Sequence, residues 1–308
     1  MNILSVFHIA AAALLLPVGT GHPPAKKLNV VATTPDLAAL AREIGGDVVD
    51  VKALAKPTED PHFVDPKPSH IVTLNRADML IDGGAELELG WLPALLESAR
   101  NDKIAAGAPG RVSASQGVRL VEIPTSFDRS KGDVHSLGNP HFLIDPVNVK
   151  LIVAQIADHL SKIDPSDAQV FSANLKKFNA ALDAKMAEWQ KTLAPFAGAK
   201  IVTYHKDFTY LAERFKLDVI ETLEPKPGIA PSPSHLATVI SAMTASNARV
   251  ILVQSFQNRR TAETVARQTG AKVLDITQQP GAIKGTDTYI QLMDYIVQTL
   301  AAGLQEQK

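Results

Sequence analysis

The chain is organised around one stretch, residues Asp164–Phe196, which reads DPSDAQVFSANLKKFNAALDAKMAEWQKTLAPF. Pro165 suits the first turn of a helix, and Pro195 ends it. At a rise of about 1.5 Å per residue, roughly 28 helical residues form a rod of about 40 Å. Large apolar side chains recur at the three- or four-residue spacing of one helix face. These are Phe171, Leu175, Phe178, Leu182, Met186, Trp189 and Leu193.

Strand and helix patterns alternate on both sides of this helix. Such alternation favours a parallel, doubly wound sheet in each half of the chain. We predict an α/β protein of two lobes, each a parallel doubly wound sheet flanked by helices, joined by one long rigid helix. A helical bundle containing the long helix is the alternative. The predicted strands are residues 28–33, 48–54, 79–82, 118–123, 200–204, 217–222, 250–254 and 272–276.

The predicted organisation has four parts. Residues 1–27 form a signal peptide and a disordered start, and residues 28–163 form the N-terminal lobe. Residues 164–196 form the linking helix, and residues 197–308 form the C-terminal lobe.

Composition excludes several classes of function. The 308 residues carry a net charge of −1, and 45% of them are hydrophobic, which is typical of a globular protein. No run of Lys and Arg marks a surface for nucleic acid. The sequence contains no cysteine, which excludes disulfides, thiolate metal ligands and lipidation on cysteine within it.

The N-terminal segment reads as an export signal. Residues Ile3–Val18 are apolar apart from Ser5 and His8, and small residues follow them. An apolar segment of this length is short for a membrane span. We therefore predict a periplasmic or otherwise exported protein that is soluble after signal cleavage. A retained membrane anchor is the alternative, since Met1-Asn2 adds no basic side chain.

Four side chains are candidates for binding chemistry: His62, His141, His205 and Asp287. Each lies in or beside a loop at a strand end or a helix start, and the carboxyl ends of parallel strands are where such sheets bind ligands. Three imidazoles and one carboxylate can fill a tetrahedral metal site. Taken singly, a loop histidine is more often a hydrogen-bonding residue than a ligand.

Several segments carry a resemblance to a known family. In chain order they read VVATTPDLAALAREIGGD, DPHFVDPKPSHIVTLNRADMLIDGG, NPHFLIDPVN, TYHKDFTYLAERFKL, PSPSHL, VARQTGAKVLDI and DTYIQLMDYIVQTLAAGL. With these segments the chain resembles the zinc/manganese solute-binding proteins of ABC importers, the cluster A-I family in which a single long helix links two lobes. The resemblance covers nearly all of the chain after its N-terminal segment.

The resemblance implies a function and a ligand set. By position, the family's metal ligands fall on His62, His141, His205 and Asp287. The implied protein captures a divalent transition metal between its lobes and delivers it to a membrane permease. A nitrogen-rich ligand set favours zinc, and manganese is the alternative ion. Nothing in the sequence suggests more than a monomer.

The chain also departs from the family pattern. Gln254 stands where the family commonly has glutamate. The loop that is often rich in histidine reads DRSKGDVHSLG here, residues 128–138. We predict a mobile surface loop with a solvated His135, and a low-affinity metal shuttle as the alternative. Glu59 is a reserve ligand, whereas Asp60 is expected to be solvated.

Two other functions use the same candidate residues. A zinc hydrolase would need a general base, for which Glu59 is the candidate, but the chain has no HExxH motif or nucleophile elbow. An exported adhesin or metal chaperone without a transporter would use the same site. We do not expect an enzyme.

Overall fold

The computed structural model describes residues 27–124, 135–226 and 228–305. The predicted signal peptide, except Lys27, and residues 128–134 of the predicted surface loop lie outside these ranges. No helix in the described ranges is both long enough and apolar enough to cross a bilayer.

The N-terminal lobe contains a sheet of four parallel strands in the order β2-β1-β3-β4. Alternate residues of its strands face opposite sides, so Val30 packs against α1 and α4 whereas Val31 packs against α2 and α3. The strands are β1 (Leu28–Ala32), β2 (Val49–Ala53), β3 (Met79–Asp82) and β4 (Arg111–Ser113). The helices are α1 (Pro35–Gly45), α2 (Pro68–Asn75), α3 (Leu92–Ala99) and α4 (Pro146–Ile163).

The C-terminal lobe repeats this strand order, as β6-β5-β7-β8, and its strands are also parallel. Helices α6 and α9 cover one face, and α7 and α8 cover the other. The strands are β5 (Lys200–Thr203), β6 (Asp218–Thr222), β7 (Val250–Val253) and β8 (Lys272–Asp275). The helices are α6 (Thr209–Phe215), α7 (Pro233–Ser246), α8 (Arg259–Thr269) and α9 (Tyr289–Gln305).

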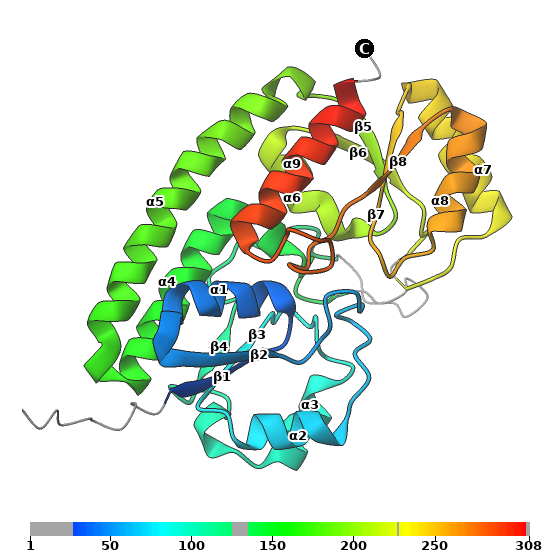
Figure 1. Cartoon of the computed structure of the whole chain (residues 1–308). Helices are drawn as coiled ribbons and strands as arrows, with labels where there is room; N and C mark the ends of the chain where they lie inside the picture. The colour runs from blue at the N-terminus through cyan, green and yellow to red at the C-terminus, as the bar shows by residue number, and fades with distance from the viewer. Residues whose placement is uncertain (1–26, 125–134, 227, 306–308) are drawn as a thin grey trace, which may run out of the picture.

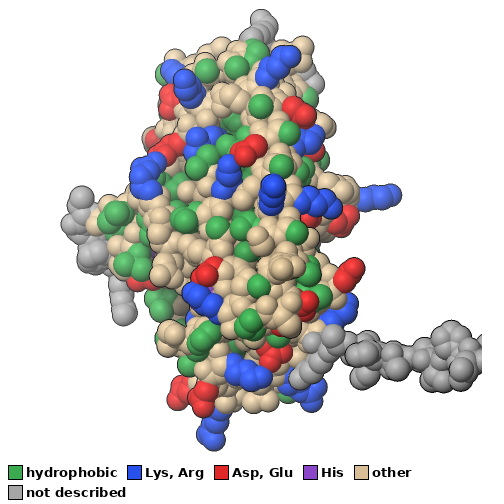
Figure 2. All heavy atoms as spheres, turned by 90° about the vertical axis from the view of Figure 1, so that its left-hand side faces the viewer, with side chains coloured by type: hydrophobic (Ala, Val, Ile, Leu, Met, Phe, Trp, Pro, Cys, Tyr) green, Lys and Arg blue, Asp and Glu red, His purple; other side chains and the backbone are tan. Residues whose placement is uncertain are grey.

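The long helix α5 (Ala168–Leu193) runs along both lobes (Figure 1). Its 26 residues span about 39 Å, and single 3-10 turns flank it at both ends. The predicted apolar face is confirmed: five of its seven side chains are buried, and Leu175 and Met186 are partly buried against the same core. Figure 2 shows the side of the molecule that carries α5, where charges of both signs are scattered, as on a solvent-exposed surface.

The two lobes share one central hydrophobic cluster. It runs from Val30 and Leu37 in the first lobe through Phe171 and Trp189 of α5 to Leu300 of α9. Two smaller clusters lie on the outer faces of the sheets. The predicted two-lobed α/β fold with a linking helix is therefore confirmed, and the helical bundle is excluded.

One predicted strand is wrong. Residues 118–123 form no strand, and the backbone N–H of Val121 instead donates to the Tyr210 hydroxyl of the other lobe, at 3.1 Å. The fourth strand is β4, which has three residues and pairs only with β3, where Val112 lies opposite Ile81. So short an edge strand leaves almost no alternating pattern in the sequence.

Candidate metal site

Three of the four predicted site residues come together between the lobes. One nitrogen each from His62, His141 and His205 lies within 4.8 Å of the other two. Their ring centroids are 5.1 to 5.6 Å apart. The rings line a cavity of about 190 Å³ whose other walls include Asp60, Asp207, Glu224 and Gln254.

Each histidine is positioned by a different element. His62 lies in the proline-rich loop between β2 and α2, and His141 immediately precedes the 3-10 turn Phe142–Ile144 that leads into α4. His205 follows β5 at its carboxyl end. Gln254 follows β7, the neighbour of β5, so the C-terminal contribution lies where the strand order reverses, as is usual for ligand sites of such sheets.

Two carboxylates fix the orientation of two histidine rings. Nδ1 of His62 lies 2.8 Å from Oδ1 of Asp60, and Nδ1 of His205 lies 2.9 Å from Oε2 of Glu224. A carboxylate only accepts, so each Nδ1 carries the proton and each Nε2 keeps its lone pair. Carboxylate–histidine pairs of this kind orient metal ligands. Asp60, which we predicted to be solvated, therefore belongs to the site.

His141 offers its nitrogen without any competing partner. The residue is 6% exposed, and its Nε2 is buried with no hydrogen-bond partner among the described residues. Burial, together with the neighbouring histidines His62, His205 and His135, holds the pKa of His141 well below its usual value. His141 is therefore neutral near pH 7, the state in which imidazole binds metals.

His205 has the opposite shift. Burial alone would lower its pKa, but the hydrogen bond to Glu224 and the charges of Asp207, Glu224 and Asp60 outweigh burial and raise it. The site thus combines a histidine that resists protonation with one that accepts a proton readily. A cation bound between them would replace that proton.

Asp287, the fourth predicted ligand, is not brought to the histidines. It is exposed and does not line the cavity. Nor does it cap the last helix. The hydroxyl of Thr288 accepts from the N–H of Gln291 at 3.2 Å, and the side chain of Gln291 accepts from the N–H of Thr288 at 3.1 Å. This reciprocal capping box starts α9 at Tyr289 and leaves Asp287 outside it.

Two buried residues near the site escaped the sequence analysis. The side chain of Gln278 donates to the carbonyl of Asp207, and its backbone N–H donates to Oε1 of Gln254 at 3.1 Å. Asp207 is fully buried; its Oδ2 accepts from Gln254 at 2.6 Å and from Gln257 at 2.9 Å. Burial raises the pKa of Asp207 to about 6, and its Oδ1 has no partner among the described residues. Asp207 follows β5 and Gln278 follows β8, so their positions after strand ends could have marked them as candidate site residues.

His135 and Glu59 lie differently from our expectations. His135 is not a freely solvated loop residue, because its Nε2 lies 3.1 Å from Nε2 of His62. Burial and the charges of His62 and His205 lower its pKa to about 4. Glu59 accepts from the N–H of Lys56 at 3.0 Å and does not line the cavity, so it is placed neither as a ligand nor as a general base.

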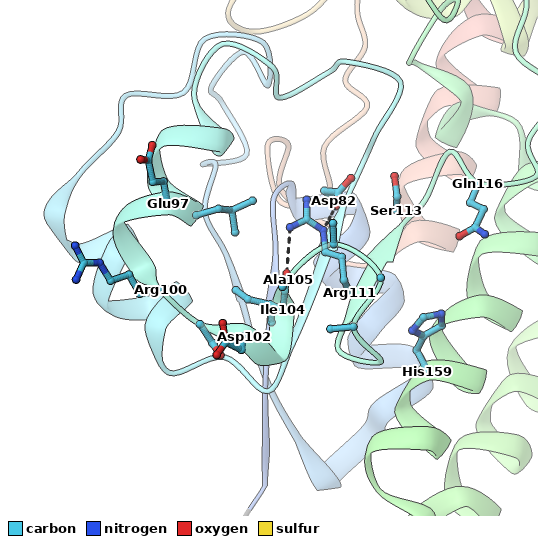
Figure 3. Close-up of a pocket in the computed structure, with 15 residues that line it drawn as sticks. Asp82, Glu97, Arg100, Asp102, Ile104, Ala105, Arg111, Ser113, Gln116 and His159 are labelled. Carbon is cyan, nitrogen blue, oxygen red and sulfur yellow. Dashed lines mark hydrogen bonds and ion pairs between the residues drawn. The ribbon is translucent and has the colours of Figure 1, made fainter.

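A larger hollow of about 800 Å³ lies elsewhere in the N-terminal lobe (Figure 3). Arg111 points toward its centre and forms an ion pair with Asp82, with 2.6 Å between Nε and Oδ2. On its wall, His159 contacts the carbonyl oxygen of Pro109 through Nδ1 at 2.7 Å. These polar groups already have protein partners, whereas Nε2 of His141 does not, so the histidine cavity is the stronger candidate site.

The fold and the site together define a class: a two-lobed α/β binding protein with a histidine cluster between its lobes. The model of the family described as zinc-uptake complex component A, periplasmic, matches residues 30–303. The chain belongs to this family.

Curated relatives and solved structures agree with this assignment. The chain is 25% identical to the metal ABC transporter substrate-binding lipoprotein ScbA of Streptococcus cristatus, over 91% of this chain and 90% of that protein. It is also 25% identical to the manganese ABC transporter substrate-binding lipoprotein PsaA of Streptococcus anginosus, with the same coverage. A zinc-bound deletion mutant of ZnuA shares the fold, with a TM-score of 0.76 at 24% identity over 90% of this chain and 98% of that chain.

Proposed function

We propose that this protein captures a divalent transition metal ion between its lobes and delivers it to the permease of an ABC importer. The observation that carries the proposal is the convergence of His62, His141 and His205, whose nitrogens lie within 4.8 Å of one another. The first two come from the N-terminal lobe and the third from the C-terminal lobe, so an ion held by all three joins the lobes. Membership of the zinc-uptake family supports this function.

Zinc is the ion that the donor set favours. Imidazole nitrogen suits zinc, whereas manganese prefers more oxygen ligands. Relatives are named for manganese and for iron, and a ZnuA variant has been solved with zinc, so manganese is the alternative cargo. We further propose that the protein is exported, soluble after signal cleavage and monomeric; the signal-like N-terminus supports export.

The test is a calorimetric titration of chelator-stripped protein with zinc and manganese in parallel. We expect one equivalent of zinc to bind tightly and manganese to bind more weakly. If neither ion binds, the proposed function is wrong. Tighter binding of manganese would keep the site but reverse the assigned ion.

The carboxylate that orients His205 is expected to tune affinity. Glu224→Ala removes the acceptor of Nδ1–H, so the ring no longer holds one tautomer and one orientation. Losing such a partner typically weakens metal binding about 10–100-fold. Titration with zinc measures the effect, and Glu188→Ala is the control, because Glu188 is 63% exposed on α5. Unchanged affinity in Glu224→Ala would remove Glu224 from the site.

Zinc binding is expected to weaken as the solution becomes acidic. His205 has a pKa above its usual value of about 6.5, so as the pH falls through that pKa the ring gains a proton that zinc must displace. Binding is therefore full at pH above the pKa of His205 and is lost between about pH 7 and pH 5. Titrations across this range, with proton release followed in two buffers, measure it. An affinity that stays constant would contradict histidine ligation.

A further inference from the structure

His135 contacts the histidine cluster without belonging to it. Its Nε2 lies 3.1 Å from Nε2 of His62, and the two ring centroids are 5.1 Å apart. The three clustered nitrogens are those of His62, His141 and His205, so His135 reaches the cluster through His62. Since the remaining residues of the cavity supply no other imidazole, His135 is the one additional nitrogen donor that the described structure places at this site.

The backbone around His135 is held in place by the N-terminal lobe. The N–H and the hydroxyl of Ser136 both donate to the carboxylate of Glu86, which lies just beyond β3. The N–H of Gly138 donates to the carbonyl of His135 at 3.2 Å. Gly138 has φ of 115°, and a Cβ there would lie 2.8 Å from the Val121 carbonyl oxygen, so only glycine fits this bend. His135 is thus presented to the cluster by fixed neighbours.

The hydrogen bonds indicate which of the two facing Nε2 atoms, that of His62 or that of His135, carries a proton. Because His62 gives its Nδ1 proton to Asp60, its Nε2 is a lone pair, and the contact requires His135 to donate its Nε2–H. Two imidazole nitrogens that bind one zinc ion tetrahedrally at about 2.0–2.1 Å are about 3.3–3.4 Å apart. The observed 3.1 Å is close to that separation. If the His135 proton moves to Nδ1, both Nε2 atoms carry a lone pair, and the two rings must then turn toward a common ion.

We propose that His135 is the fourth nitrogen ligand and that it makes the site selective for zinc over manganese. This inference rests on the proposed function. An all-imidazole tetrahedron of His62, His135, His141 and His205 suits zinc, whereas manganese lies lowest in the affinity order and prefers oxygen. Asp207 is the rival donor, since it lines the same cavity and its Oδ1 has no partner among the described residues. Its other oxygen is tied to two glutamines, and its carboxylate is not among the grouped ligand atoms.

The experiment compares His135→Ala, His135→Gln and Asp207→Asn with the unaltered protein and with His159→Ala. The control histidine lies away from the cluster, on the wall of the larger hollow. Zinc and manganese affinities are measured by competition with a chelator, and zinc-edge X-ray absorption counts the imidazoles. Both His135 variants are expected to lose more than about 100-fold in zinc affinity, because losing a ligand costs more than the roughly 10–100-fold typical of an outer partner, and to keep manganese affinity within about threefold. The number of imidazoles is expected to fall from four to three.

Two results would overturn the inference. One is that His135→Gln, shown by thermal unfolding to be as stable as the unaltered protein, keeps its zinc affinity and its spectrum. The other is that Asp207→Asn, rather than a His135 variant, removes one ligand from the zinc spectrum. Either result leaves the proposed function intact if His205→Ala still abolishes binding. If the unaltered protein binds no metal, the proposed function itself is wrong.

Discussion

Replacement of His205 by alanine is expected to abolish tight zinc binding. His205 is the only member of the three-histidine cluster that comes from the C-terminal lobe, so its loss removes a ligand and the link between the lobes. The loss of an outer partner of a ligand already costs about 10–100-fold, so the loss of the ligand itself is expected to exceed about 100-fold. Calorimetric titration of His205→Ala with zinc measures the change.

The matched control for this prediction is His159→Ala. It removes an imidazole of the same size that lies outside the cavity and contacts the Pro109 carbonyl. Its zinc affinity is expected to equal that of the unaltered protein. Retention of tight binding by His205→Ala, with unchanged unfolding temperature, would show that the ion is held elsewhere.

Replacement of Phe171 by alanine is expected to lower the free energy of unfolding by about 3–5 kcal/mol. Phe171 is fully buried near the start of α5, in the cluster that both lobes share. Truncation removes apolar contacts and leaves a cavity that the surrounding helices cannot fill. Urea denaturation followed by circular dichroism measures the loss, which is expected as a lower midpoint with an unchanged slope.

Val170→Ala provides the comparison on the same helix. Val170 is 39% exposed, so its truncation is expected to cost less than about 0.5 kcal/mol, and the higher helix propensity of alanine offsets part of that cost. Equal destabilisation by both variants would show that burial in the shared core does not determine the effect. A loss below about 1 kcal/mol in Phe171→Ala would contradict the buried position of its ring.

Local periodicity was sufficient to predict the linking helix and most strands. The α5 pattern spans seven positions on one face, and each buried strand is a compact apolar run, so local sequence carries the signal. β4 was not predicted in this way, because its three residues form a strand only by pairing with β3. Pairing between distant segments is a tertiary property that no short window contains.

The candidate site could be predicted only in part. Four side chains beside element ends were predicted as a group, and the structure brings only the three histidines together. Asp287 was chosen for its place at a helix start and also by the resemblance, but Thr288 and Gln291 form the helix cap, and its side chain is exposed. His135 could not be placed because its position depends on Ser136 and on Glu86, which is 50 residues earlier in the chain.

The shared core has a consequence for how the protein passes on its cargo. If the lobes opened far enough to expose about 400 Å² of apolar surface of that core to water, the free-energy cost would be about 10 kcal/mol. That cost is comparable to the whole stability of a typical domain. We therefore expect the filled and empty forms to have nearly the same outline. The proposed permease would then have to distinguish them by the positions of a few loop residues rather than by the distance between the lobes.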